Sequence, residues 1–259
     1  MGQVEATTDG GRASEPDARG TLGTVRNAML LLALLSEGPA YQQLTDLAER
    51  SGLSVPTVHR LLRSLVLADL VEQDPSSSRY GLGPEMVRLA QRYLARLPVL
   101  GALAPYLLPL RDAIGQTVHV AVLVRGHVVY VDRVDSSGGG LYRDTHQVHP
   151  ALETAAGRVL AARAAEDAWQ QAIDAASPDD RKQAEDDRGA WRAAAHLLTT
   201  GDLPEDPREL AVPIVDGAGR CVAALAASPP PEATQDKVSE IATHLSRTAR
   251  AAGRTLSHA

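Results

Sequence analysis

A succession of three helix-forming segments constrains the N-terminal part of this 259-residue chain more than any other feature. In segments that begin near residues 21, 41 and 54, apolar residues recur at the three- and four-residue spacing of an amphipathic helix. Gly38-Pro39 ends the first segment, Gly52 ends the second, and Ser54 is suited to cap the third. The sequence therefore predicts three short helices joined by tight turns.

A β-hairpin is predicted directly after these helices. Residues 70–73 and 79–82 are strand-like, and they flank Asp74–Ser78, a cluster of turn-forming residues. Three helices and a hairpin in this order predict a winged helix-turn-helix. The residues of the first helix that the spacing places toward the core are Val25, Met29, Leu32 and Leu35.

The third helix has one apolar side and one polar side. Val58, Leu61, Leu62 and Leu65 form the apolar stripe, and no acidic residue occurs from residue 55 to residue 67. Arginine can bind guanine through two hydrogen bonds, and nearby polar residues can reach bases or phosphates. We therefore expect this helix to enter a groove of double-stranded DNA. The predicted DNA-binding residues are Ser54, Pro56, Thr57, His59, Arg60, Arg63 and Ser64, with Arg79 beside the hairpin turn and Arg26 in the first helix.

The charge distribution is compatible with DNA binding, although the whole chain carries a net charge of −6. Residues 1–20 sum to −2, residues 21–97 to +1 and residues 98–259 to −5. A charge of +1 is a weak signal for nucleic-acid binding. In the alternative interpretation, Arg60 and Arg63 are ordinary solvated residues. Only the combination of helix spacing, turn, acid-free stretch and hairpin favours DNA.

Beyond residue 98 the pattern changes to a mixture of strands and helices. The β-rich residues 117–134 turn at Arg125-Gly126, and residues 209–226 form a second stretch of this kind, so each predicts a hairpin. Such a mixture predicts an α+β domain rather than a parallel βαβ array. The segments with helical patterns are residues 84–97, 100–115, 154–165, 166–176, 181–198 and 233–256.

Several classes of protein lack support in the sequence. Cys221 is the only cysteine, which excludes an intrachain disulfide and a cysteine-rich zinc site. Asp144, His146 and His149 could suggest a metal site, but no fourth ligand follows at a matching spacing, so we predict neither metal nor cofactor. We find no nucleophile–base pair and predict no enzyme. The lack of a signal-like start and of a long apolar run predicts a cytoplasmic protein with no membrane partner.

Two parts of the sequence resemble the IclR family of transcriptional regulators. The segment LTDLAERSGLSVPTVHRLLRSLVLADLVEQDPSSSRYGLGPEM is similar to the family's winged helix-turn-helix. Further along, TVHVAVLVRGHVVYVDRV is similar to the first hairpin of its effector-binding domain, ETAAGRVLAA to a helix start beside its pocket, and AVPIVDGAGRCVAALAASPP to its closing hairpin. The resemblance covers nearly the whole chain from Thr21 onward and is weakest between residues 165 and 209.

The resemblance implies an α+β protein in which an N-terminal winged helix-turn-helix precedes a C-terminal α/β effector-binding domain of GAF-like fold. It also implies a homodimer or a dimer of dimers that binds a palindromic operator in double-stranded DNA. The expected domains are a disordered tail (residues 1–20), the winged helix-turn-helix (21–83), a linker helix (84–98) and the effector-binding and oligomerisation domain (99–259).

The resemblance further implies a pocket for a small-molecule effector, between the sheet of that domain and the helix that begins at TAAG. The backbone amides of Ala155 and Ala156 would open this helix and suit an anionic group of a ligand. Carried over to this sequence, the effector-binding positions are Ala155, Ala156, Glu209, Ala226 and Ser228.

Two of these positions depart from the family pattern. Family members that respond to small oxo-acids tend to carry serine in place of Ala226 and cysteine in place of Glu209. A lost hydroxyl and an added carboxylate both disfavour a small carboxylate ligand, so the sequence favours a larger, less acidic or cationic effector. In the alternative interpretation, Glu209 only points to solvent at the start of a strand.

The predicted function is a sequence-specific DNA-binding regulator, with repression favoured over activation, whose operator binding responds to a small-molecule effector. Two other classes stay open on the sequence alone. In one, the chain is an enzyme whose helix-turn-helix docks a partner, and in the other it is an architectural protein with no effector response. A ligand that stabilises the protein by binding would separate the regulator from the architectural protein.

Overall fold

The computed structural model describes residues 18–136, 148–199 and 208–257. These residues form two compact units, one that extends to Tyr93 and one that begins at Leu94. Each unit has its own cluster of buried apolar side chains. The helix α4 (Glu85–Leu94) occupies the segment predicted to be a linker helix, and none of its residues is buried.

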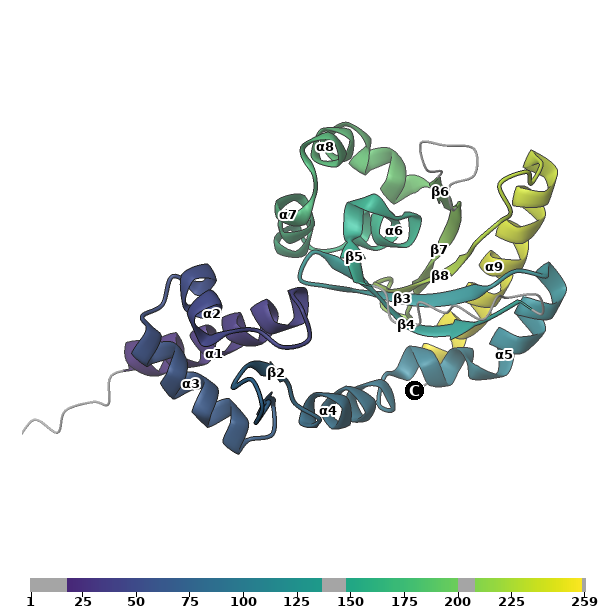
Figure 1. Cartoon of the computed structure of the whole chain (residues 1–259). Coiled ribbons are helices and arrows are strands. Elements are labelled where there is room, and N and C mark those ends of the chain that lie inside the picture. The colour runs from purple at the N-terminus through teal and green to yellow at the C-terminus, as the bar shows by residue number, and fades with distance from the viewer. Residues whose placement is uncertain (1–17, 137–147, 200–207, 258–259) are drawn as a thin grey trace, which may run out of the picture. The chain divides into compact units, whose positions relative to one another are not determined.

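The first unit is a winged helix-turn-helix, as predicted (Figure 1). Leu31, Leu47 and Leu62, one from each helix, are fully buried in its core. The two strands of the wing pair antiparallel, with Glu72 opposite Gly81. The elements of this unit are α1 (Ala18–Glu37), α2 (Leu44–Ser51), α3 (Val55–Leu67), β1 (Val71–Gln73) and β2 (Tyr80–Leu82).

Two helix starts differ from their predictions. Helix α1 begins at Ala18, so the last three residues of the predicted tail 1–20 are helical. Helix α2 begins at Leu44 rather than near Tyr41. The reason is that Gln42 pairs with Tyr80 through two backbone hydrogen bonds of 2.8 and 2.9 Å, which holds its backbone extended.

The side of α1 that packs against the core also differs from the predicted side. Val25 and Met29, which are predicted to face inward, are 61% and 50% exposed. Leu31 is buried instead, together with Leu32 and Leu35. Residues 28–35 are almost entirely apolar, so their spacing does not determine which side of the helix packs inward.

The side chain of Gln42 connects three parts of the first unit. It is almost completely buried, and its Nε2 donates to the carbonyls of Leu34 (3.0 Å) and Leu35 (3.2 Å) near the C-terminal end of α1. Its Oε1 accepts from Nη1 of Arg50 in α2 at 2.7 Å. Carbonyls at a helix end have no partner within the helix. Gln42 therefore satisfies two of them while its backbone holds the wing.

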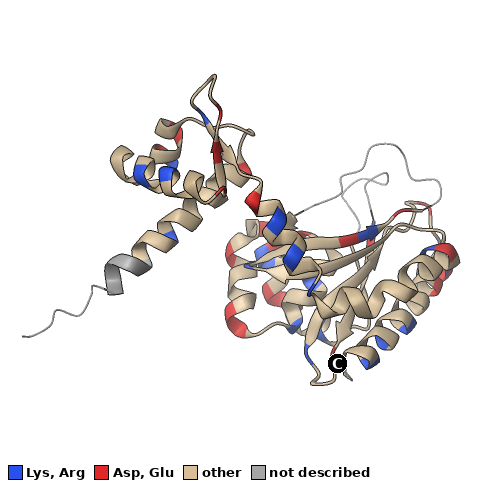
Figure 2. Ribbon diagram, turned by 90° about the horizontal axis from the view of Figure 1, so that it is seen from below, with Lys and Arg blue, Asp and Glu red and all other residues tan. Residues whose placement is uncertain are grey.

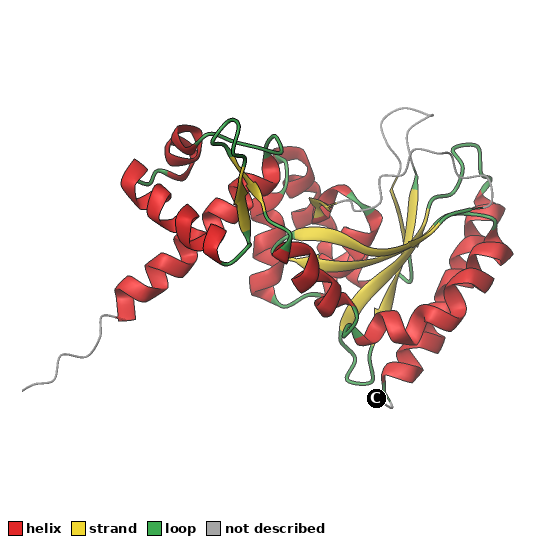
Figure 3. Cartoon of the chain, turned by 60° about the horizontal axis from the view of Figure 1, so that its bottom comes forward, coloured by secondary structure: helices red, strands yellow, loops and turns green. Residues whose placement is uncertain are grey.

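The second unit contains a six-stranded antiparallel sheet with helices on both faces (Figure 3). The strand order is β5-β4-β3-β8-β7-β6, and the two predicted hairpins meet where β3 pairs with β8. The predicted mixed fold is confirmed. The elements of this unit are α5 (Pro98–Ile114), β3 (Val118–Val124), β4 (His127–Val134), β5 (Val148–Pro150), η1 (Ala151–Glu153), α6 (Ala155–Arg163), α7 (Glu166–Ala175), α8 (Pro178–Ala193), β6 (Leu197–Thr199), β7 (Glu209–Val215), β8 (Cys221–Ala227) and α9 (Gln235–Leu256).

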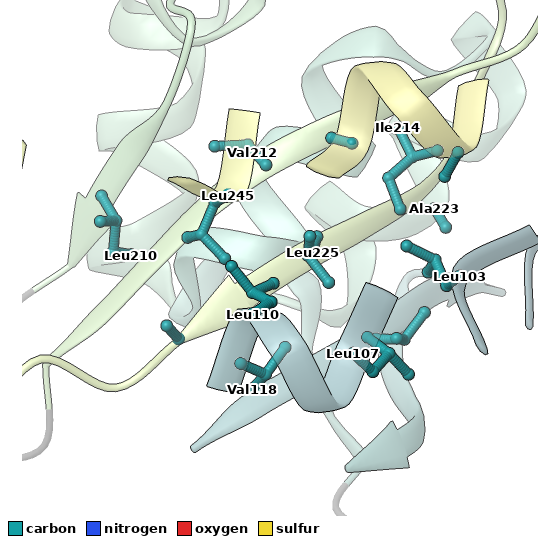
Figure 4. Close-up of a cluster of buried hydrophobic side chains, with 14 of the residues drawn as sticks. Leu103, Leu107, Leu110, Val118, Leu210, Val212, Ile214, Ala223, Leu225 and Leu245 are labelled. Atoms are coloured by element: carbon teal, nitrogen blue, oxygen red, sulfur yellow. The ribbon is translucent and has the colours of Figure 1, made fainter. Parts of the chain in front are cut away.

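Side chains along the central strands alternate between two helical layers. Leu210, Val212 and Leu225 pack with the apolar sides of α5 and α9 (Figure 4). The neighbouring residues Ala211 and Ala224 face the opposite way and pack against α6. Burying one Leu or Val side chain contributes about 1.5–3 kcal/mol, so these leucines and valines contribute substantially to the stability of this unit.

The region between β4 and β7 differs most from its prediction. The strands β5 and β6 are not predicted, because three residues are too few to show an alternating pattern. The predicted exposed helix at residues 181–198 starts earlier and buries Ala184 and Trp191. The guanidinium of Arg158 lies 4.9 Å from the centroid of the Trp191 ring, which holds α8 against α6.

Replacing Gln42 with Ala is expected to lower the free energy of unfolding of the first unit by about 1–3 kcal/mol, because two carbonyls and Arg50 lose a buried partner. Denaturant unfolding measures the loss. The neighbouring Gln43 is exposed and gives a matched control, since Gln43→Ala should change stability by less than about 0.5 kcal/mol. Equal losses in the two variants would contradict the connecting role of Gln42.

Candidate DNA-binding face and effector pocket

The polar side of α3 is exposed, while Val58, Leu61, Leu62 and Leu65 are buried in the core. This 13-residue helix carries two arginines and no acidic residue (Figure 2). Among the residues that the structure describes, Arg60 and Arg63 form no ion pair, so both guanidinium groups are available to a base or a phosphate. The α3 face consists of the exposed residues Ser54, Pro56, His59, Arg60, Arg63 and Ser64 and the half-buried Thr57.

Ser54 occupies the N-cap position of α3, as predicted, but its side chain does not cap the helix. Its Oγ lies 2.8 Å from Oγ1 of Thr57, so the two hydroxyls form a polar pair at the exposed helix start. The carbonyl of Ser54 accepts from the N–H groups of Thr57 (2.9 Å) and Val58 (3.0 Å). The cap is therefore made by the backbone.

The turn of the wing is held by the carboxylate of Asp74. It accepts a hydrogen bond from the hydroxyl of Ser77, another from Ser76 Oγ at 2.7 Å, and one from the backbone N–H of Ser77 at 3.0 Å. The side chains of Ser77 and Ser76, in that order, lower the pKa of Asp74 to about 2. Arg79 is exposed directly after this turn, and Arg26 is exposed on α1.

A concave surface between the start of α2 and the wing turn is not predicted from the sequence. It encloses about 450 Å³, and Gln43 stands there at the N-cap of α2. A helix N-terminus favours phosphate, so this surface adds candidates for contact with the DNA backbone. The sequence gives no sign of it, because it forms only when the pairing of Gln42 with Tyr80 folds the wing back. The lining residues are Gln43, Leu44, Thr45, Ser77, Ser78 and Arg79.

In the second unit, a pocket of about 190 Å³ lies beside the start of α6. The alternation along the strands puts His119, Tyr130 and Glu209 on the α6 side of the sheet. The rings of His119 and Tyr130 meet edge to face, with their centroids 5.4 Å apart. The residues that line this α6 pocket are His119, Tyr130, His149, Glu153, Thr154, Thr199, Arg208, Glu209 and Ser228.

Glu209 connects β7 to β4 and to α6. Its Oε1 accepts from the hydroxyl of Tyr130 at 2.6 Å, and its Oε2 accepts from the backbone N–H of Ala156 at 3.0 Å. The interpretation in which Glu209 only points to solvent is therefore wrong. The carboxylate lies at the N-terminal end of α6, where the helix dipole favours negative charge.

Two further N-terminal donors of α6 are engaged by Thr154. Its Oγ1 accepts from the N–H of Gly157 at 3.0 Å, and its carbonyl accepts from the N–H of Arg158 at 2.9 Å. Gly157 has no room for a side chain, because a Cβ there would collide with the carbonyl oxygen of Ala151. The glycine of TAAG thus lets α6 lie close against η1, with its N-terminus at Glu209.

Burial changes the ionisation of three groups in the α6 pocket. It raises the pKa of Glu209, while the hydrogen bonds from Tyr130 and Ala156 act in the opposite direction. Burial and then the charge of Glu209 raise the pKa of Tyr130, so the phenol stays protonated at neutral pH. Burial, followed by the charge of Arg133, lowers the pKa of His119 to about 4, so its imidazole is uncharged at neutral pH.

The predicted effector-binding residues divide into two groups. Glu209 and Ser228 line the pocket. Ala155, Ala156 and Ala226 are completely buried, and their side chains do not reach it. Ala156 contributes only its backbone N–H, which Glu209 already occupies.

Seven lining residues of the α6 pocket are not among the predicted effector contacts: His119, Tyr130, His149, Glu153, Thr154, Thr199 and Arg208. His119 and Tyr130 are the two that lie on the central strands β3 and β4. His119 is the one polar residue of β3, and Tyr130 is the one aromatic residue among the apolar residues 128–131 of β4. Both lie on the same side of the sheet as Glu209. That pattern could have identified them once the pairing of β3 with β4 and β8 is known.

The structure describes only some of the residues to which the predictions on metal and membrane binding apply. Asp144 and His146 lie outside the described residues, and His149 lines the α6 pocket. Over the described ranges, no group of three or more His, Cys, Asp or Glu residues is arranged to hold a metal ion. Over the same ranges, no single helix is long and apolar enough to cross a membrane, and only α4 with α5, as a bent pair, meets that test by length and composition.

Family models match both units. Residues 24–75 match the IclR helix-turn-helix domain, and residues 91–257 match the C-terminal domain of bacterial IclR transcriptional regulators. The second match alone covers more than half of the chain. The chain belongs to the IclR family. The predicted resemblance is confirmed, and neither matching IclR model describes an enzyme.

Individual IclR-type relatives match a shorter part of the chain. The chain is 34% identical over 142 residues to the glycerol operon regulatory protein of Streptomyces coelicolor, covering 54% of this chain and 55% of that protein. It is 28% identical over 140 residues to the transcriptional regulator XynR of Escherichia coli, covering 54% and 56%. The chain thus spans about half the length of the curated relatives it matches.

Solved IclR structures match nearly the whole chain. A putative IclR transcriptional regulator from Silicibacter sp. TM1040 is 27% identical, with a TM-score of 0.75 over 91% of this chain and 95% of its own. An IclR homologue from Microbacterium hydrocarbonoxydans, solved in complex with 4-hydroxybenzoate, is 21% identical, with a TM-score of 0.67 over 91% and 100%. These likenesses confirm the predicted fold class.

Replacing Glu209 with Gln is expected to change how stability depends on pH. A carboxyl whose pKa is raised in the folded state contributes stability below its ordinary pKa, and that contribution is lost as the pH rises through the raised value. The unfolding free energy of the wild type minus that of Glu209→Gln should therefore fall as the pH rises above about 4.5. Chemical denaturation at several pH values measures this difference, and parallel profiles for the two proteins would contradict the raised pKa.

Proposed function

We propose that this chain is a transcriptional regulator that binds a specific operator in double-stranded DNA through the α3 face and the wing. A small molecule bound in the α6 pocket modulates that binding. The observation that carries the proposal is the α3 face itself. It presents no acidic residue and two arginines that form no ion pair with any described residue, on a helix whose other side is fixed in the core.

The residues of the first unit take two kinds of role in this proposal. Thr57 and Arg60 contact base edges, since Arg can bind guanine through two hydrogen bonds. His59, Arg63 and Ser64 reach bases or phosphates from the same helix. The residues that contact the DNA backbone or fix the start of α3 are Arg26, Ser54, Pro56 and Arg79.

The effector role of the second unit is supported by the chemistry of the α6 pocket. Small-molecule sites combine aromatic rings with convergent polar groups. The α6 pocket has the same combination in a smaller volume, about 190 Å³. The Microbacterium homologue of the same fold is known in complex with a small aromatic molecule, 4-hydroxybenzoate. A ligand that binds one state of the protein more tightly shifts the population toward that state, and thereby changes operator affinity.

The proposed assembly is a homodimer or a dimer of dimers on a palindromic operator, acting as a repressor in the cytoplasm. Exposed large apolar side chains support association of copies, because an isolated soluble protein rarely gathers them on one helix. On α1, Val25 and Met29 are exposed. On α4, Val87, Leu89 and Tyr93 are exposed. Repression requires only that the bound protein occlude a promoter, and it needs no additional activating surface.

Replacing Arg60 with Ala is expected to weaken operator binding by about 1–3 kcal/mol and to relax the preference for one base pair. The wild type should show a salt-sensitive preference for DNA from its own upstream region, which a gel-shift titration measures. Arg254 is exposed on α9 in the other unit and carries the same charge, so Arg254→Ala is the matched control. Unchanged affinity in Arg60→Ala, or no preference of the wild type for any duplex, would overturn the proposed function.

A further inference from the structure

The N-terminus of α6 already holds a carboxyl group supplied by the chain, that of Glu209. Burial raises the pKa of this group, while three donors, the hydroxyl of Tyr130 and the backbone N–H groups of Ala156 and Ala155, act in the opposite direction and favour its charged form. We infer that Glu209 is a built-in anion in the α6 pocket, so that the pocket excludes carboxylic acids and takes an effector that presents a hydrogen-bond donor, either an amine or a hydroxyl compound. This inference rests on the proposed effector function and names the class of ligand.

The backbone N–H groups at the start of α6 already have acceptors within the chain. A ligand carboxylate binds at a helix N-terminus through free backbone N–H groups. Here the N–H groups of Ala155 and Ala156 both interact with the carboxylate of Glu209. The N–H of Gly157 donates to the hydroxyl of Thr154, and the N–H of Arg158 donates to the Thr154 carbonyl. A carboxylate from outside would have to displace Glu209, and it would lie against a like charge while doing so.

The arginine of the α6 pocket is partly engaged by the backbone. Arg208 lines the pocket, but its Nη1 donates to the carbonyls of Pro230 (3.5 Å), Pro231 (3.1 Å) and Ala233 (3.1 Å). Its Nε is buried, without a hydrogen-bond partner among the residues described. The backbone therefore engages one nitrogen of this guanidinium, Nη1, while Nε is buried and is not exposed to an incoming carboxylate.

The carboxylate of Glu209 can accept further hydrogen bonds. A carboxylate offers about four lone-pair sites on its two oxygens. Tyr130 and Ala156 each use one of them, at Oε1 and Oε2. The remaining sites suit a ligand N–H or O–H group. The uncharged imidazole of His119 and the hydroxyl of Ser228 add uncharged polar partners, and a second carboxylate, Glu153, is exposed at the pocket.

Two substitutions of Glu209 separate these effects. Glu209→Ala removes the carboxylate and the methylene next to it, so a short carboxylate such as propionate can occupy the N-terminus of α6. Glu209→Gln keeps the space filled but removes the charge. Its single amide oxygen can accept from the N–H of Ala156, and its NH2 group can donate to the hydroxyl oxygen of Tyr130. Glu209→Gln is the matched control, and Glu209→Ser is a second opened variant in case Glu209→Ala folds poorly.

The experiment measures thermal shifts and calorimetric affinities of the full chain with propionate and benzoate, and with benzylamine and benzyl alcohol as counterparts without a carboxylate. We expect propionate to bind Glu209→Ala or Glu209→Ser at least about tenfold more tightly than the wild type or Glu209→Gln, with a matching rise in Tm. We expect any wild-type binding in the benzyl series to favour the amine or the alcohol over benzoate.

Two results would overturn the inference. One is stabilisation of the wild type by benzoate or propionate at an affinity equal to that of the opened variants. The other is opened variants that fold, as judged by their melting curves, yet gain no affinity for propionate. Operator binding by the wild type is measured separately, so a chain that binds no DNA but shows the propionate gain would disprove the proposed function and leave the built-in anion intact.

Discussion

The architecture of the second unit depends on the alternation of side chains along its central strands. On β7, Leu210 and Val212 face the α5–α9 layer, while Glu209 and Ala211 face α6. A register shift of one residue would move the carboxylate of Glu209 into the apolar layer and a leucine into the pocket. The same two-residue period therefore specifies both the core and the site, and neither can change without the other.

Small side chains make the contact between α6 and the sheet close enough for this chemistry. Ala211, Ala224 and Ala226 are completely buried beneath α6, and Gly157 lets the helix lie against the carbonyl of Ala151. As a result the backbone N–H of Ala156 comes within 3.0 Å of Glu209. A larger residue at any of these positions would lift the helix and leave a buried carboxylate without its donor, which costs more than the lost hydrogen bond alone.

Much of the fold could be predicted, because period and turn residues are local properties of the sequence. The helix starting after Ser54 and the hairpin turning at Arg125-Gly126 are both found where their residues place them. The side of α1 that packs inward could not be fully predicted, since residues 28–35 are apolar on every side and do not encode the rotation of the helix. The partners of Glu209 could not be predicted either. Two strands, β3 and β8, lie between Tyr130 and Glu209 in the sheet, and the two residues are 79 positions apart in the chain.

The position of Glu209 also limits how a ligand in this pocket can influence the rest of the protein. A ligand shifts an equilibrium only by the difference in its affinity for two states. Glu209 accepts from β4 through Tyr130 and from α6 through Ala156, so a donor that takes over one of its lone pairs acts on the contact between a strand and a helix. In a protein whose ligand supplies the anion, binding adds that contact. In this chain the contact exists before any ligand arrives, so binding can only strengthen, redirect or break it.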